Sequence, residues 1–406
     1  MQRIDLFTFE HSQQYGVQQA FSEGLQKALL SLGVKSSLFP YKELGDGRLL
    51  AELIKNAPDC TAGFNVTVAN HSPLEPLGIP HVAMIVDSAT YFTELLKTPN
   101  AIVSFVEEDS VGFFKMLGMK YVFHLAHAVD ESMLNDQNTF RDLDVVMCGS
   151  CIDPDEILTT WNTLLSAQSV ARLVEVAEMV LASERLSHLQ AFVELIEERG
   201  DFEKELVDKS IEFFDLMNSL DQYIRGVDRI RIVDAIDRPV HIIGAKKYEA
   251  VWAKAIKNSK KLVFHNEVPF GEMPAILMRS RVVINSFPMF KRGLHERMLM
   301  SLACGASVLG SDNLYVQSSF PASLAVGSYL SPQYGRANAF IEAALQDEEA
   351  RHCAVVATHH TIKSHHTWNV RAKQLVQMLE PILAERKKHT PVGISHLFAK
   401  NDTTDH

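Results

Sequence analysis

Short apolar runs alternate with amphipathic helical segments over two long parts of this chain, and this alternation limits the fold more than any other feature. In the first part, an apolar run at residues 4–9 precedes a helical pattern at residues 17–32 that ends at Gly33. Strands separated by helices pair in parallel, and such sheets bind ligands at the carboxyl ends of their strands. The strands predicted in this part span residues 4–9, 62–68, 80–86, 101–105, 121–123 and 144–147, with the run at 145–148 completing the sheet.

A helical stretch separates the two parts. From about residue 153 to 237 the sequence has long helical periodicity without a convincing strand, and Pro239 then restarts the alternation. At roughly 150 residues per domain, 406 residues allow two or three domains. The helices predicted in the middle span residues 157–164, 169–182, 186–199 and 203–225. After Pro239 we predict strands at 240–243, 262–264 and 281–284 and helices at 246–257, 269–279 and 367–383.

Composition and charge exclude several classes of protein. The chain is 47% hydrophobic and 22% charged, which is the balance of a soluble globular protein. The net charge of -11 argues against a general nucleic-acid binder, because such proteins have a basic surface. No apolar run approaches the roughly 18 residues that span a bilayer, and no signal-peptide pattern is present at the start. With five cysteines, an odd number, we expect a cytoplasmic protein with reduced thiols and no structural disulfide.

The segment at residues 293–312, GLHERMLMSLACGASVLGSD, has the pattern of an anion-binding helix start. We expect His295, Glu296 and Arg297 in the first helical turn, a helix end at Gly305 and a short strand at residues 306–309. The unpaired N–H groups and the dipole of a helix N-terminus attract anions. Arg297 adds positive charge, so this segment predicts a phosphate site.

Each residue of this segment also has a structural interpretation. Arg297 could be a surface arginine, and His295 a core histidine or a donor to phosphate. Glu296 could cap the helix or bind a sugar hydroxyl. Lys246, which follows the strand at 240–243, could reach a diphosphate or remain a solvated lysine.

Several segments resemble one family. The clearest is Asn285-Ser286-Phe287-Pro288 followed by Gly293-Leu294-His295-Glu296-Arg297, which is similar to a signature of loop, G-x-H-E-R and helix. Further similar segments are GIPHVAMIVDS at 78–88, FFKMLGMKYVFHLAHAVD at 113–130, the strand with Gly-Ser at 145–150 and HTWNVRA at 366–372. Together they resemble the CgeB-like, or spore-maturation-protein-like, branch of the group 1 glycosyltransferases.

The resemblance implies an α/β fold of the GT-B type, with two Rossmann-like domains facing a cleft and a helical insert between them. It implies transfer of a sugar from a nucleotide-diphosphate sugar to a glycan, lipid or protein acceptor, without a metal or a cofactor. The implied boundaries are an acceptor domain at 1–150, a helical bridge at 151–238, a nucleotide-sugar domain at 239–365, a crossing helix at 366–390 and a mobile tail at 391–406. The expected donor-binding residues are Lys246, Asn285, Gly293, His295, Glu296, Arg297 and Gly305.

One position departs from the pattern. Many related enzymes carry a glutamate five residues before the glycine that matches Gly305, and that glutamate binds the ribose of the nucleotide. This chain has Met300 there. Ribose recognition must then come from elsewhere, with Glu296 as one candidate.

A transferase that inverts the anomeric centre also requires a base for the acceptor's proton, from the first domain. His11, in the loop after the first strand, and Asp87, at the end of another, are the candidates, and each could instead be an ordinary loop residue. Three acidic residues at 107–109 are weaker candidates, because a run of charges is usually solvated.

Two other motifs carry less weight. Cys148 and Cys151 have the spacing of a thiol redox pair, but a strand rather than a helix start precedes them. The histidine pairs at 359–360 and 365–366 lack a nearby acidic or cysteine cluster, so we expect a polar helix face and no metal site.

Other functions remain open at this point. A nucleotide-sugar 2-epimerase would use the same phosphate site without an acceptor, and a non-catalytic binding protein of the same fold would fit Met300. The expected partners are a nucleotide sugar and its acceptor, with no nucleic acid. The absence of a spanning segment leaves peripheral contact with a membrane open.

Overall fold

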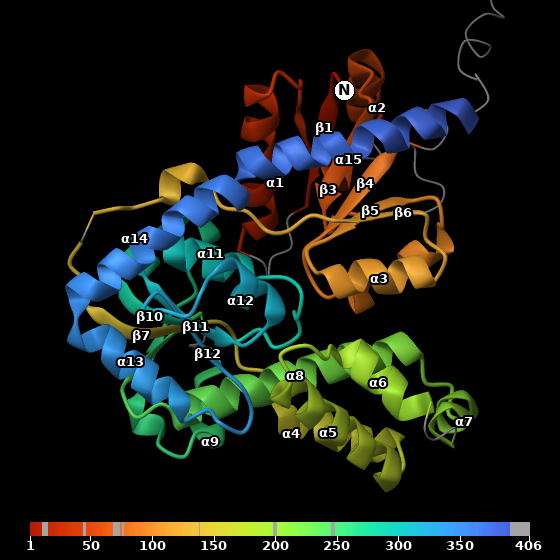
Figure 1. The fold of residues 1–406 in the computed structure, drawn as a ribbon. Helices are drawn as coiled ribbons and strands as arrows, with labels where there is room; N and C mark the ends of the chain where they lie inside the picture. Colours follow the sequence, from red (N-terminus) through yellow and green to blue (C-terminus); the bar gives the residue numbers. More distant parts are fainter. Residues whose placement is uncertain are drawn as a thin grey trace, which may run out of the picture.

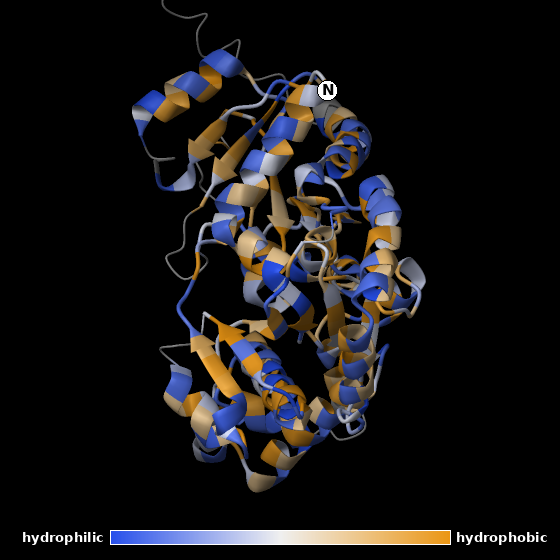
Figure 2. Cartoon of the chain, turned by 90° about the vertical axis from the view of Figure 1, so that its left-hand side faces the viewer, coloured by the Kyte–Doolittle hydropathy of each residue, from blue (hydrophilic) through white to orange (hydrophobic). Residues whose placement is uncertain are grey.

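The computed structural model describes residues 1–9, 15–43, 46–67, 74, 77–137, 139–197, 201–244 and 248–389. This part of the chain contains two six-stranded parallel sheets, each flanked by helices, which is the predicted α/β architecture (Figure 1). Figure 2 shows the strands largely in hydrophobic colours and the surrounding helices in both colours. The first sheet has the order β2 (Leu38–Pro40), β1 (Ile4–Thr8), β3 (Cys60–Phe64), β4 (His81–Ile85), β5 (Ile102–Phe105) and β6 (Tyr121–His124). Its helices are α1 (Val17–Ser31), α2 (Gly47–Asn56), η2 (Ala89–Lys97) and α3 (Glu108–Met116).

The second sheet contains a strand that we had expected in the first. Its order is β12 (Val326–Tyr329), β11 (Ser307–Ser311), β10 (Ser280–Asn285), β7 (Leu143–Cys148), β8 (Val240–Ile243) and β9 (Leu262–His265). Because β7 pairs with β10 and β8, the prediction that residues 145–148 complete the first sheet is wrong. The residues of β7 from Val145 to Cys148 are all buried, as in a central parallel strand covered on both faces. The chain therefore enters the second sheet before it forms the helical insert.

The helical insert lies in the chain between β7 and β8, two neighbouring strands of the second sheet. It consists of α4 (Pro154–Leu164), α5 (Ala167–Ala182), α6 (His188–Glu197), α7 (Asp201–Asp208) and α8 (Phe213–Ala235). The single helix predicted at 203–225 is in fact two helices, because the chain turns between α7 and α8, where Ser210 has a φ of 53°. Sequence periodicity could not show this break, since serine is also common inside helices.

Helix α8 is anchored to both α/β domains. Near its middle, Asp221 accepts a hydrogen bond from Tyr91 of η2 in the first domain (3.1 Å). About two turns later, the buried carboxylate of Asp228 accepts hydrogen bonds from four hydroxyl groups that belong to the second domain. These are the hydroxyls of Ser286, Ser311, Tyr329 and Tyr334. The segment of α8 between the two aspartates is thereby fixed across the domain junction.

The remaining helices cover the second sheet and return to the first. They are α9 (Glu249–Ala255), α10 (Met273–Arg279), α11 (Glu296–Ala303), α12 (Leu314–Ser319), α13 (Arg336–Gln346), α14 (Glu348–His365) and α15 (Trp368–His389). In Figure 1, α15 runs across the first domain beside α1. Trp368 shares a core with Phe21 of α1, and a side chain at Gly24 would collide with the Trp368 ring. At Trp368–His389, α15 is longer than the helix predicted at 367–383. The expected tail at 391–406 lies outside the described residues.

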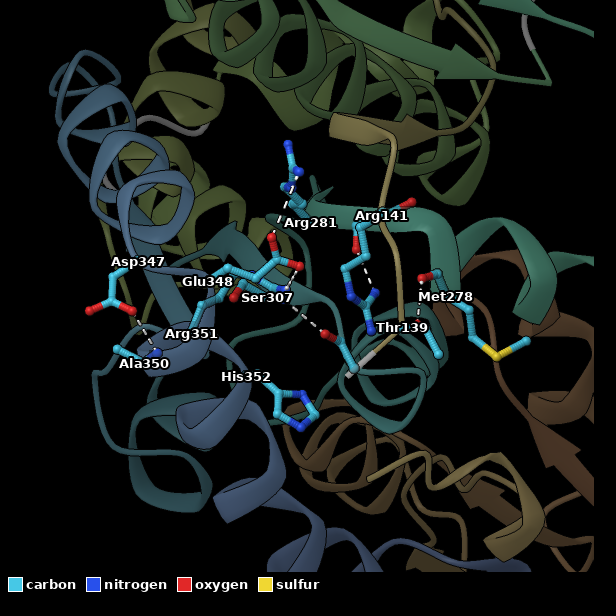
Figure 3. Close-up of polar contacts among 12 residues, drawn as sticks. Thr139, Arg141, Met278, Arg281, Ser307, Asp347, Glu348, Ala350, Arg351 and His352 are labelled. Carbon is cyan, nitrogen blue, oxygen red and sulfur yellow. Dashed lines mark hydrogen bonds and ion pairs between the residues drawn. The ribbon is translucent and has the colours of Figure 1, made fainter. Parts of the chain in front are cut away.

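Two buried arginines hold the C-terminal end of α11 (Figure 3). Arg141, fully buried, donates to the carbonyl oxygens of Leu277 (3.2 Å) and Ser280 (2.7 Å) at the end of α10. It also donates to the carbonyl oxygen of Cys304 at the end of α11 (2.9 Å). Arg351, also fully buried, donates to the next carbonyl, that of Gly305 (3.0 Å). Cations at helix C-termini complement the negative end of the helix dipole, so the two arginines stabilise this end of α11.

Candidate functional site

A cleft between the two domains opens at the carboxyl ends of both sheets. Its cavity has a volume of about 380 Å³. The first domain contributes residues that follow β3, β4 and β6, and the second contributes residues that follow β7, β8 and β10 together with the start of α11. The polar and charged residues that line it include Asn65, Asp87, His127, Arg225, Arg229, His295, Glu296 and Arg297. The site thus occupies the position at which parallel α/β sheets bind ligands.

The start of α11 faces this cleft, and His295 caps it. The Nδ1 atom of His295 accepts a hydrogen bond from the backbone N–H of Arg297 (3.3 Å). Burial, together with the nearby Arg297, lowers the pKa of His295 well below its ordinary value. The imidazole is therefore neutral, so His295 shapes the helix start but adds no charge to it.

Positive charge comes instead from arginines on two elements. Arg297 projects from α11, while Arg225 and Arg229 project from α8 and line the same cleft. The Arg229 side chain is buried and donates to the carbonyl of Ser150 (2.9 Å). Burial, and then repulsion from Arg225 and Arg297, lowers the pKa of Arg229 to about 9, which still leaves it charged at neutral pH. Cations that repel one another around a cavity favour an anionic ligand.

Arg225 is held by a carboxylate of its own helix. It donates to Asp221 (3.0 Å), and although burial alone would lower its pKa, the charge of Asp221 raises it overall. Sequence reasoning missed both arginines of α8. The available signal was a set of charged residues at 221, 225, 228 and 229, spaced three and four apart inside an apolar helical pattern, where buried charges require partners.

Two carboxyl groups complete the polar lining. Glu296 is largely buried, which raises its pKa to about 7 although Arg297 opposes the shift. Its Oε2 lies 3.1 Å from His295 Nδ1 and 3.7 Å from His127 Nε2. Asp87 accepts a hydrogen bond from Asn65 (2.7 Å), and desolvation by the surrounding protein raises its pKa against the opposing effect of Arg225. Each carboxyl can therefore gain or lose a proton nearer neutral pH than a carboxyl with the ordinary pKa.

The raised pKa of Glu296 predicts a pH-dependent stability. Its pKa in the folded protein, about 7, exceeds the reference value of 4.5. Below the reference pKa the side chain is protonated in both the folded and the unfolded state, so its ionisation costs the folded state no free energy there. As the pH rises through the folded pKa, the buried side chain must lose its proton, and the free energy of unfolding falls by at most about 3 kcal/mol. We expect Glu296→Gln to raise the Tm at about pH 8 and to leave it nearly unchanged at about pH 4.5. Melting curves of both proteins across this range check the prediction, and a pH-independent difference would contradict it.

The structure separates the other predicted donor residues from this cleft. Asn285 is buried at the end of β10 and does not line the cavity. Gly293 forms a bridge with Glu107 of the first domain, where a side chain would collide with the carbonyl of Val106. Gly305, with a φ of 83°, ends α11 and leaves space for the Arg141 guanidinium. These three positions shape the fold around the site.

His11 and Lys246 lie outside the described residues. Of the predicted site residues that the structure describes, four line one cavity: Asp87, His295, Glu296 and Arg297. Met300 lines the same cavity and is buried. No carboxylate occupies its position, so any ribose recognition there would be apolar.

The weaker candidates have structural roles. Glu107 is buried and accepts hydrogen bonds from the backbone N–H groups of Ser110 (2.9 Å) and Arg292 (2.9 Å), so it caps α3 and joins the two domains. Cys148 and Cys151 are buried free thiols, and burial raises the pKa of both, that of Cys151 to about 12. Such thiols are poor nucleophiles.

One histidine of each pair departs from the expected polar face, whereas His360 and His365 are exposed as expected. His359 is buried and contacts the Asp136 carboxylate (2.6 Å) and the carbonyl of Leu302 (2.9 Å), while His366 is buried beside Arg371 (3.0 Å). Both histidines face the interior because α14 packs against α11. Within the described ranges, no three metal-ligating side chains come together. In the same part of the chain, no helix has the length and apolar character to cross a membrane.

Comparisons with known proteins agree with this architecture. Residues 228–377 match the model of a family described as "Glycosyl transferase-like". Sucrose-phosphate synthase from Thermosynechococcus elongatus is similar in structure, with a TM-score of 0.55 and 9% sequence identity, over 95% of this chain and 100% of that one. No curated protein matches the chain by sequence.

Two further solved structures are similar over nearly their whole length. AviGT4, a glycosyltransferase involved in avilamycin A biosynthesis, has a TM-score of 0.55 and 11% identity, over 95% of this chain and 99% of that one. An α-glucosyltransferase in complex with UDP-glucose and DNA containing an abasic site has a TM-score of 0.52 and 10% identity, over 93% of this chain and 98% of that one. At these identities the likeness shows the fold. The two sheets and the cleft between them form a GT-B fold, which confirms the predicted fold class.

Proposed function

We propose that this protein of GT-B fold is a glycosyltransferase of the CgeB-like branch, which moves a sugar from a nucleotide-diphosphate sugar to a glycan, lipid or protein. The observation that carries the proposal is the convergence of Arg225, Arg229, Arg297 and the start of α11 on one interdomain cleft. Breaking the bond between a sugar and a diphosphate leaves negative charge on the leaving group. Preorganised cations and helix N–H groups stabilise such charge without a metal or a cofactor.

The rigidity of the arginines supports this role. Arg229 is tied to the carbonyl of Ser150, and Arg225 is tied to Asp221. Neither guanidinium has to reorganise when charge develops, which is the condition for effective electrostatic stabilisation. Arg297 is the arginine that lies on α11 itself, in its first turn, so we assign it to the phosphate that leaves with the nucleotide.

The acceptor side of the reaction would involve Asp87. It lies at the end of β4 in the first domain, across the cleft from α11, and its raised pKa makes it a better proton acceptor than an aspartate with the ordinary pKa. We propose that Asp87 accepts the proton of the acceptor hydroxyl. The net charge of -11 disfavours nucleic acid as the acceptor. All five cysteines are free, which fits our proposal that the protein acts in the cytoplasm.

A panel of nucleotide sugars tests the proposed function. A ligand that binds only the folded state stabilises it by about 2.7 kcal/mol at roughly 100 times its Kd. We expect UDP-glucose, or another nucleotide-diphosphate sugar of the panel, to raise the Tm by several degrees. The matching sugar without its nucleotide serves as the control. If no member of the panel raises the Tm at millimolar concentration, the proposed function is wrong.

A further inference from the structure

The interdomain cleft has an apolar wall beside the proposed phosphate site. Arg297 and Met300 are three residues apart on α11, so their side chains share one face, and both line the cleft. Met300 packs in one hydrophobic cluster with Cys148 at the end of β7 and Ile243 at the end of β8, and Met273 of α10 packs against that cluster. All four side chains of this wall line the cleft. Burial raises the pKa of Cys148 and the charge of Arg297 opposes the shift, so the wall lies next to the guanidinium.

Polar groups at this wall are occupied within the protein. The Cys148 thiol donates to the sulfur of Met273 (3.7 Å). The backbone N–H of Gly149, which follows β7, donates to the carbonyl of Ile243 (3.0 Å). Met300 contributes a thioether, which is only a weak hydrogen-bond acceptor. A ligand hydroxyl pressed against this wall would therefore lose its water without gaining a good partner, which is unfavourable.

The carboxyl groups of the cleft are directed elsewhere. Among the described residues that line the cavity, they belong to Asp87, Glu267 and Glu296. Asp87 is part of the first domain, and the Oε2 atom of Glu296 is turned toward that domain, 3.7 Å from His127 Nε2. Glu267 is exposed and follows β9, the edge strand of the second sheet. A ligand group that rests on the wall itself meets sulfur and aliphatic side chains.

The proposed function determines which part of the donor reaches the wall. The transferred sugar has to lie on the first-domain side of the diphosphate, beside Asp87. The nucleoside then lies on the opposite side, along the second domain, and its pentose is the part next to the diphosphate. From Arg297 to Met300 the helix rises by about 4.5 Å, which is comparable to the three bonds that join a phosphorus atom to the pentose ring. The pentose therefore rests on Met300 when Arg297 holds the phosphate.

We propose that the donor is a 2′-deoxynucleoside diphosphate sugar, whose pentose presents a methylene group at C2′ to the wall of Cys148, Ile243, Met273 and Met300. The proposal rests on the proposed function. A ribonucleotide would bring a hydroxyl group to the same wall, where a buried hydroxyl without a partner is unfavourable. A thioether packs well against a methylene group, because it is flexible and polarizable. The wall therefore selects against the 2′-hydroxyl.

UDP and 2′-deoxy-UDP are suitable probes, because they differ only in the hydroxyl group at C2′. We expect calorimetry on the full chain to show at least fivefold tighter binding of 2′-deoxy-UDP than of UDP. Equal affinities, or tighter binding of UDP, would overturn the proposal.

Substitutions in the wall show whether the preference arises there. Met300→Gln supplies an amide that can pair with a 2′-hydroxyl, so we expect the two affinities to come within twofold or the preference to reverse. Met300→Leu is the matched control, because leucine is apolar and similar in volume, and it should keep the fivefold preference. Met273 is only partly buried, so Met273→Gln repeats the test where an amide disturbs the core less. A fivefold preference that survives in both glutamine variants would refute the assignment to this wall.

The nucleotide-sugar shift in Tm, measured on the same protein, separates this proposal from the proposed function. A shift together with equal affinities for the two nucleotides would refute the deoxynucleotide and leave the proposed function standing. Tighter binding of 2′-deoxy-UDP without a shift by any nucleotide sugar would refute the proposed function, and with it the assignment of the deoxynucleotide to a donor. If neither nucleotide binds and no nucleotide sugar shifts the Tm, both proposals are wrong.

Discussion

Replacing Arg297 with alanine is expected to abolish the stabilisation of the folded protein by its nucleotide-sugar donor. The side chain lines the cleft at the start of α11, where the helix N–H groups and Arg229 also provide positive potential. Hydrogen bonds to a charged group contribute about 1.5–3 kcal/mol each, so the loss of a bidentate contact would weaken binding at least tenfold. Thermal melts with and without the donor measure this effect.

The same variant should fold normally. Arg297 lowers the pKa of the neighbouring Arg229 by repulsion, so its removal relieves unfavourable charge in the free protein. We expect the Tm without ligand to be unchanged or slightly higher. Arg292→Ala is the matched control, since Arg292 is half exposed, follows the same strand and does not line the donor cleft. A donor shift that survives in Arg297→Ala would remove Arg297 from the phosphate site.

Replacing Arg141 with methionine is expected to lower the free energy of unfolding by about 3–5 kcal/mol, because charged donors to three buried carbonyl groups are lost together. Those carbonyls end α10 and α11, and the side chain of Arg141 is fully buried. Burial and the nearby Arg351 lower the pKa of Arg141 to about 10, which leaves it charged at neutral pH. The variant therefore loses both the hydrogen bonds and the complement to two helix dipoles.

Urea and thermal unfolding of Arg141→Met measure this loss. Arg279→Met provides the control, because Arg279 lies at the end of α10 but is 54% exposed and pairs with Asp142 at the surface. Exposed ion pairs contribute about 0–1 kcal/mol, so the control should unfold nearly as the wild type does. A loss below about 1 kcal/mol in Arg141→Met would show that the carbonyl groups find other partners.

Local sequence patterns predicted most elements near their observed bounds. The strand predicted at 240–243 matches β8, and the helix predicted at 17–32 matches α1 within one residue. The short strands β2 and β12 were missed, because their apolar runs are too brief for a periodicity to be read. Helix α2 was missed although its leucines at 49 and 53 have helical spacing.

Local patterns predicted the candidate site at the start of α11 and at Asp87, which follows a strand of the first domain. Residues 295–297 form a continuous segment, so their place at a helix start followed from the local pattern. Arg225 and Arg229 lie on α8 of the helical insert, far from α11 in the sequence. The residues around them do not indicate that α8 packs against the second sheet. The glycines illustrate the same limit, because only the tertiary structure shows that Gly293 lies against the first domain and Gly305 against Arg141.

By itself, the sequence determined most strand and helix types, the helical insert and the start of α11 at residues 295–297, because periodicity and capping are properties of neighbouring residues. The tertiary structure decided which sheet holds β7, since parallel pairing joins Val145 to Val282, far away in the chain. It also decided that Arg225, Arg229, Arg297 and Asp87 share one cleft. Charges converge there because Asp221 and Asp228 fix α8 between the domains, and these hydrogen bonds exist only after both sheets have folded.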